Sequence, residues 1–108
     1  MPDSSLGLQL FLLALKKLLK RPEKVSFINR EKNIEAMERH GLTVQALLKR
    51  LGALKPENYK SGPHPDDDGS GGSIWVFLLN EDGTRFYIKL KLYTIEGEDY
   101  LKILSFHD

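Results

Sequence analysis

The chain of 108 residues contains no cysteine, so it can form no disulfide and offers no thiolate as a metal ligand. This absence fits a reducing compartment. Net charge is also nearly absent, because 16 Lys and Arg face 15 Asp and Glu, a formal net charge of +1. Any attraction to a nucleic acid must therefore come from local segregation of charge rather than from the bulk charge. A chain of this length suits one compact domain, and no internal repeat is visible.

A long apolar run is missing too. The most apolar segment, "LGLQLFLLALKKLLK", is shorter than the ~20 residues that a membrane-spanning helix needs. Asp3 stands where a signal peptide would be positive, and no small-x-small cleavage site follows. We therefore expect a buried amphipathic helix, no membrane association and a cytoplasmic protein.

Residues 1–55 are predicted to be mainly helical. Each predicted helix begins at a side chain whose oxygen can accept a hydrogen bond from an unpaired amide: Ser4 or Ser5 for a helix to about Lys20, Asn29 for a helix over 30–40, and Thr43 for a helix to about Leu54. Pro22 prevents continuation of the first helix, and Gly41 ends the second in the left-handed conformation that glycine adopts at little cost.

Residues 56–73 are predicted to form a loop, and residues 74–108 to form antiparallel strands over 74–79, 84–93 and 100–107. The segment "KVSFI" can add an edge strand. The predicted fold is thus α+β, with N-terminal helices on one face of a C-terminal antiparallel sheet of three or four strands.

A tight turn at Asp82-Gly83 predicts the register of the first two of these strands. The core pairs that follow are Leu79 with Phe86, Phe77 with Ile88, and Trp75 with Leu90. Matching apolar residues then predicts the pairs with the last strand: Leu92 with Leu104, and Leu90 with Phe106. This register would place His107 beside Lys89, and Ser105 beside Lys91, on the opposite face.

Alternation in "RFYIKLKL" places cations on the face that does not enter the core, at Arg85, Lys89 and Lys91. The plainest interpretation is a solvated sheet face. Tyr87 and Tyr93, however, lie in the same row and offer stacking surface beside phosphate-binding charge, as in RNA-binding proteins. With His107 nearby, the set could also move protons at an anionic centre.

Other motifs give weaker evidence of a functional site. Three consecutive carboxylates, Asp66 to Asp68, could ligate Mg²⁺ but are more typical of a solvated loop. "GSGG" lacks the lysine and the helix of a phosphate-binding loop. His40 is expected to interact with the end of a helix, and His64 to be exposed; neither has a partner at zinc spacing.

The motifs "NYKSGP", "SIWVF", "FYIKLKL" and "LKILSFH", together with the upstream "FINREKNIEAMERHGLT", resemble the motility quorum-sensing regulator (MqsR) family. These proteins are small ribonuclease toxins of bacterial type II toxin–antitoxin pairs, with a fold similar to the RelE-type toxins. The resemblance covers the chain from about Val25 onward. It implies a RelE-like arrangement of helices and sheet.

The resemblance also implies an active site. The family's Lys between Tyr and Ser falls on Lys60, its strand Tyr on Tyr87, and its basic residue after Ser-Phe on His107. Its Gln after the Trp falls on Val76, whose side chain cannot hydrogen-bond to a base. We expect catalysis from Lys60, Tyr87 and His107. RNA contacts are expected from five further residues: Tyr59, Arg85, Lys89, Lys91 and Tyr93.

The implied function is metal-independent cleavage of messenger RNA through attack of the ribose 2′-hydroxyl, which inhibits translation. The implied partners are messenger RNA and a cognate antitoxin protein, with no cofactor. Two alternatives stay open: a non-catalytic module that binds RNA or protein, and a toxin that cuts only when the ribosome completes its site.

Overall fold

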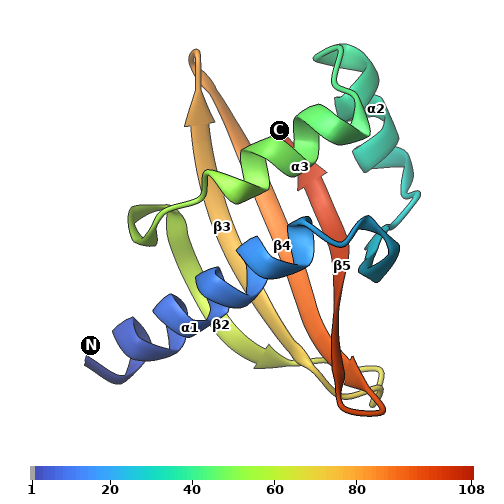
Figure 1. Ribbon diagram of the computed structural model, residues 1–108. Coiled ribbons are helices and arrows are strands. Elements are labelled where there is room, and N and C mark those ends of the chain that lie inside the picture. Colours follow the sequence, from blue (N-terminus) through green and yellow to red (C-terminus); the bar gives the residue numbers. More distant parts are fainter. Residues whose placement is uncertain (1) are drawn as a thin grey trace.

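The computed structural model describes residues 2–108, with side chains from residue 6 onward, and has an α+β fold (Figure 1). In the described part, three α helices precede most of the sheet: α1 Pro2–Leu19, α2 Glu31–Arg39 and α3 Val44–Gly52. The five strands are β1 Val25–Phe27, β2 Tyr59–Pro65, β3 Ser73–Glu81, β4 Thr84–Ile95 and β5 Glu98–His107. The predicted α+β class is confirmed.

The sheet has the order β1-β5-β4-β3-β2, with β1 parallel to β5 and every other pair antiparallel. The prediction of three or four strands is therefore wrong. The edge strand predicted at "KVSFI" is present as β1, but β2 lies inside 56–73, the range predicted to be a loop. This strand is not recognisable in the sequence because it contains Gly62, Pro63 and Pro65, which are rare inside strands. An edge strand with irregular pairing tolerates them because its outer amides need no partner.

Only some of the predicted helix starts are confirmed. Thr43 precedes α3, and its Oγ1 accepts a hydrogen bond from the amide of Ala46 at 3.1 Å. The cap predicted at Asn29 is wrong, since Arg30 occupies that position without a side-chain hydrogen bond. Because α1 begins at Pro2, Ser4 and Ser5 lie within it, and their side chains fall outside the described part.

The core lies between one face of the sheet and helices α1 and α3, which cross it on the same side (Figure 1). Five residues of α1 are buried in it: Leu8, Phe11, Leu12, Leu15 and Leu18. Phe11 stacks on Trp75 with ring centroids 4.6 Å apart, which ties the helix to β3. Among the described residues, no helix is long and apolar enough to span a membrane.

The predicted register between β3 and β4 is confirmed at all three core pairs. Asp82 and Gly83 have φ of 51° and 82°, as expected of a tight hairpin turn whose central residues are left-handed. The register predicted between β4 and β5 is wrong. Leu90 lies opposite Ile103, and Phe106 lies opposite Ile88.

A second tight turn and a bulge explain this difference. Glu96 and Gly97 both have positive φ, so the hairpin closes between Ile95 and Glu98 and sets the pairing from there. Continued without a break, that register would turn Phe106 away from the core. The register shift at Leu104 inserts one residue into β5 and returns Phe106 to the core.

Candidate functional site

The sheet face opposite the helices, called here the open face, carries most of the predicted site residues. Tyr87 and His107 face each other across β4 and β5, and their rings stack with centroids 5.5 Å apart and an interplanar angle of 24°. Both side chains are half-buried. His107 thus lies beside Tyr87 rather than beside Lys89, because the bulge shifts the last residues of β5.

Two cations on β4 flank Tyr87 on this face. Lys89 lies opposite Ser105 of β5, is half-buried, and makes no ion pair or hydrogen bond with any described side chain. Arg85 is exposed, and its Nε donates to Oδ1 of Asn80 at 3.3 Å. Positive charge therefore surrounds the stacked rings and is not neutralised by a described acid.

Lys91 is in a different situation. Its side chain is buried, and its Nζ donates to Oδ2 of Asp66 at 2.6 Å and to the hydroxyl of Ser70. The Lys91 hydrogen bond lowers the pKa of Asp66, which keeps that carboxylate ionised. The loop after β2 therefore folds back over β4 and neutralises Lys91. The acidic loop is therefore not wholly solvated, since Asp66 is engaged by Lys91.

Tyr93 lies at the other end of the same row. Its ring stacks on Tyr100 at 5.7 Å between centroids, and Nζ of Lys102 lies 5.3 Å from the Tyr93 centroid. Tyr93 is six residues from Tyr87, about 20 Å along the strand at the usual rise. The open face thus has two aromatic pairs, with the acidic loop between them and close to Tyr93.

The structure does not bring Tyr59 and Lys60 to the stacked rings. Tyr59 packs on the core, 6.2 Å between centroids from Trp75, and its hydroxyl donates to the carbonyl of Gly62 at 2.6 Å. Lys60 is exposed at an irregularity in the pairing of β2. Since β2 lies three strands from β5, Lys60 and His107 are separated by about 14 Å across the sheet.

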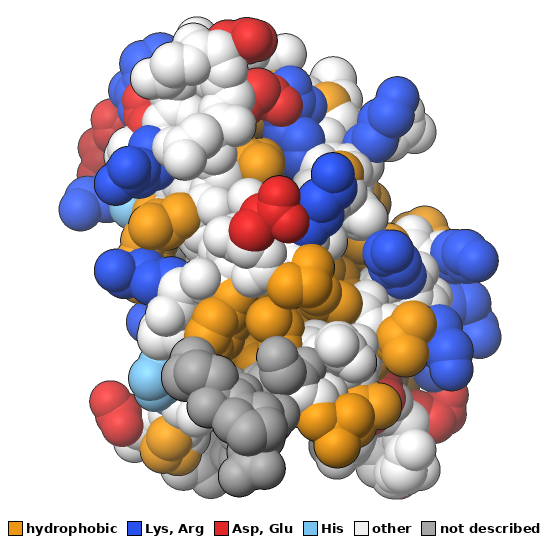
Figure 2. Space-filling model, turned by 90° about the vertical axis from the view of Figure 1, so that its left-hand side faces the viewer, with side chains coloured by type: hydrophobic (Ala, Val, Ile, Leu, Met, Phe, Trp, Pro, Cys, Tyr) orange, Lys and Arg blue, Asp and Glu red, His pale blue; other side chains and the backbone are white. Residues whose placement is uncertain are grey.

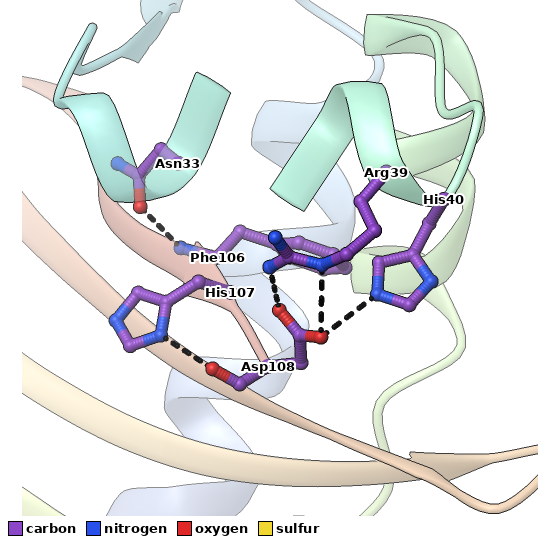
Figure 3. Close-up of polar contacts among 6 residues, drawn as sticks. All are labelled: Asn33, Arg39, His40, Phe106, His107 and Asp108. Atoms are coloured by element: carbon purple, nitrogen blue, oxygen red, sulfur yellow. Dashed lines mark hydrogen bonds and ion pairs between the residues drawn. The ribbon is translucent and has the colours of Figure 1, made fainter. Parts of the chain in front are cut away.

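A polar cluster under the end of β5 holds the bulge (Figure 3). Asn33 of α2 is buried; its Nδ2 donates to the carbonyls of Ile28 and Leu104, both at 3.0 Å. Its Oδ1 accepts from the amide of Phe106 at 3.1 Å. One side chain therefore binds the backbone of β5 at the bulge residue Leu104 and at Phe106, and so fixes the start of the segment that carries His107.

A second cluster fixes the residue after His107 (Figure 3). The Asp108 carboxylate accepts hydrogen bonds from the guanidinium of Arg39 and lies 3.1 Å from Nε2 of His40. The Arg39 hydrogen bonds, followed by that of His40, hold the pKa of Asp108 far below its usual range. The sequence predicts only a helix-end role for His40. No local pattern links it, or Asn33, to residues about 70 positions away.

A hollow of about 260 Å³ lies beside His107, lined also by Lys32, Glu35, Arg39 and Asp108. It joins the open face to α2. Among the described residues, no group of three His, Asp or Glu side chains could hold a metal ion. His64 is exposed on β2, as expected.

Comparison with known proteins adds no relative: no family model, no curated protein and no solved structure matches this chain.

Proposed function

We propose that the protein is the toxin of a type II toxin–antitoxin pair, a metal-independent endoribonuclease that cuts messenger RNA and inhibits translation. The observation that carries the proposal is the stacked pair of Tyr87 and His107 on the open face, beside the unneutralised Lys89. A histidine can exchange protons near neutral pH, and a solvated structural face has no need of one at this place.

In the proposed reaction, a base removes the proton of a ribose 2′-hydroxyl, and the 2′-oxygen forms a bond to the adjacent phosphorus. The bond from phosphorus to the 5′-oxygen then breaks, and an acid protonates that oxygen. The products are a 2′,3′-cyclic phosphate and a 5′-hydroxyl. His107 transfers a proton, Tyr87 orients the ribose or phosphate, and Lys89 and Arg85 stabilise the charge that develops on the phosphate oxygens.

The resemblance to the motility quorum-sensing regulator family supports this proposal and extends it. It supplies a role for Lys60, which at its distance would contact a neighbouring phosphate rather than the one that His107 serves. It also supplies a RelE-like relation of helices to sheet, a cognate antitoxin as partner, and the cytoplasm as the place of action. Tyr59 and Lys91 have no part in the proposed contact surface, because their side chains are engaged in the core and with Asp66.

The test is cleavage of a single-stranded RNA by the purified protein in EDTA, with the cyclic phosphate end assayed directly. His107→Ala should lower the rate by about 10² to 10⁴, and the limb of the pH–rate profile near neutrality should disappear. His107→Lys should keep RNA affinity without restoring that limb. His64→Ala, at an exposed histidine of β2, is the matched control and should keep the parent rate.

Other outcomes identify the alternatives. RNA binding without cleavage at any pH would indicate a binding module, and cleavage only in a translating mixture would indicate dependence on the ribosome. Full activity of His107→Lys with an unchanged pH profile would show that His107 is only a cation.

A further inference from the structure

Helix α1 is apolar on two opposite sides. Its buried side faces the sheet, as described above. Its outer side exposes three leucines, with 61% of Leu6, 59% of Leu10 and 58% of Leu13 accessible to solvent. A helix that borders the solvent usually carries polar residues on its outer side, so this outer apolar row calls for an explanation.

The exposed row has a defined period. The spacing along α1 is four, three and four residues from Leu6 through Leu10 and Leu13 to Lys17, as in a seam between two packed helices. Lys20 comes three residues further on, directly after the end of α1. These five residues are called the α1 seam. Both lysines are exposed, and neither forms an ion pair with a described side chain. The seam is therefore apolar in its first half and cationic in its second.

Two hollows flank the cationic half. One, of about 510 Å³, extends from Leu10 past Lys17 and Lys20 to Lys24 of the turn before β1. The other, of about 460 Å³, lies between Lys16 of α1, Lys20 just after that helix, and Lys49 of α3. Figure 2 views the molecule from the left-hand side of Figure 1, and toward its right, where the helices lie, hydrophobic side chains lie next to a group of Lys and Arg.

We propose that the α1 seam binds an amphipathic helix of a protein partner, which places apolar residues on the three leucines and carboxylates on Lys17 and Lys20. The period selects a helix, because an i, i+4, i+7 row of apolar anchors is the pattern that helices use to pack on one another. The charge selects an acidic one, because opposite charges along a seam decide the choice of partner.

Two other occupants fit less well. A second copy packed in parallel would bring Lys17 against Lys17 and Lys20 against Lys20, and an antiparallel copy centred between Leu10 and Leu13 would put Leu6 against Lys17. A lipid surface would favour a broad apolar face bordered by cations on both sides, whereas here the leucines form a single row that changes to lysine along the helix axis.

The test uses synthetic three-heptad peptides and fluorescence anisotropy. Each of two acid peptides carries three leucines and two glutamates at successive seam positions. The glutamates follow the leucines in the peptide designed for parallel packing and precede them in the peptide designed for antiparallel packing. A basic peptide of each direction has lysine in place of glutamate. The parent protein should bind one acid peptide at least about tenfold more tightly than its basic counterpart.

Matched variants locate the binding. Leu10→Gln should weaken binding of the acid peptide by about tenfold or more, whereas Val44→Gln, at a 53% exposed position of α3, should not. Lys17→Glu should reverse the preference, so that the basic peptide binds more tightly. Because these side chains are exposed, the variants should keep the parent circular dichroism spectrum.

Equal binding of acid and basic peptides, or binding unchanged by Leu10→Gln, would overturn the proposal. Two further outcomes would overturn it in favour of another occupant. These are self-association of the parent that Leu10→Gln abolishes in sedimentation, and binding to vesicles of phosphatidylcholine and phosphatidylglycerol that the same variant loses. None of these results bears on RNA cleavage, since the open face lies on the other side of the sheet.

Discussion

Replacing Asn33 by alanine should lower the free energy of unfolding by about 2–6 kcal/mol. The buried amide of Phe106 would lose its acceptor, and an unsatisfied buried donor costs about 1–3 kcal/mol. The carbonyls of Ile28 and Leu104 are only partly buried, so water can replace Asn33 there in part. Each of these two losses should cost about 0.5–1.5 kcal/mol. The total is a large share of the ~5–15 kcal/mol that stabilises a typical domain.

The assay is urea unfolding followed by the fluorescence of Trp75, the single tryptophan, which is buried against α1. The midpoint should fall with an unchanged slope, since the folded state stays compact. Asn29→Ala, at an exposed asparagine just before α2, is the control and should change stability by less than about 0.5 kcal/mol. A loss below about 1 kcal/mol for Asn33→Ala would refute the role given to this side chain at the bulge.

The remaining predictions concern charge, pH and backbone. Lys89→Met should weaken binding to single-stranded RNA and reduce its salt dependence, whereas Lys91→Met should leave both unchanged in a filter-binding assay, because only Lys89 is free of a described acid. Asp108→Asn should have a lower urea midpoint than the parent at pH values above the ordinary carboxyl pKa of about 3.9. The difference should vanish as the pH falls below that value, because the pKa of Asp108 is lowered in the folded state and protonation of the carboxylate removes its stabilising contribution. Gly72→Ala should cost about 2–3 kcal/mol, because its φ is +83° and a Cβ would lie 2.7 Å from a β4 carbonyl oxygen. Gly69→Ala, with φ of +76° and no atom within 4 Å, should cost only about 1 kcal/mol by the same measurement.

The sequence predicts the strands best where a turn residue and an alternating pattern agree. Asp82-Gly83 and the apolar alternation on both sides of it predict the β3–β4 register correctly. At the next hairpin, Glu96-Gly97 is the same kind of signal, and counting from it gives the correct pairing of Leu92 with Leu101. The bulge beyond it has no local signal, because its stabilising side chain, Asn33, lies far away in the sequence.

For the candidate site, too, the sequence predicts the features that depend on local alternation and misses those that depend on distant contacts. Alternation along β4 predicts correctly that Tyr87 and Lys89 share a face with the row of cations. It cannot predict that a loop covers part of that face and neutralises Lys91 with Asp66, because the contact depends on the path of the chain between β2 and β3. The position of Tyr59 in the core is hidden for a similar reason, since β2 itself is not recognisable from its glycine and prolines.

The two surfaces proposed for binding lie on opposite sides of one sheet, since the α1 seam is on the outer side of a helix that packs against the face away from Tyr87 and His107 (Figure 1). A helix bound only at the seam would therefore leave the stacked rings accessible. It could lower RNA cleavage only by a further segment that reaches around an edge of the sheet or by an effect on the fold. A seam-binding acid peptide should accordingly leave the KM for RNA unchanged, whereas a partner that inhibits by covering the open face should raise it.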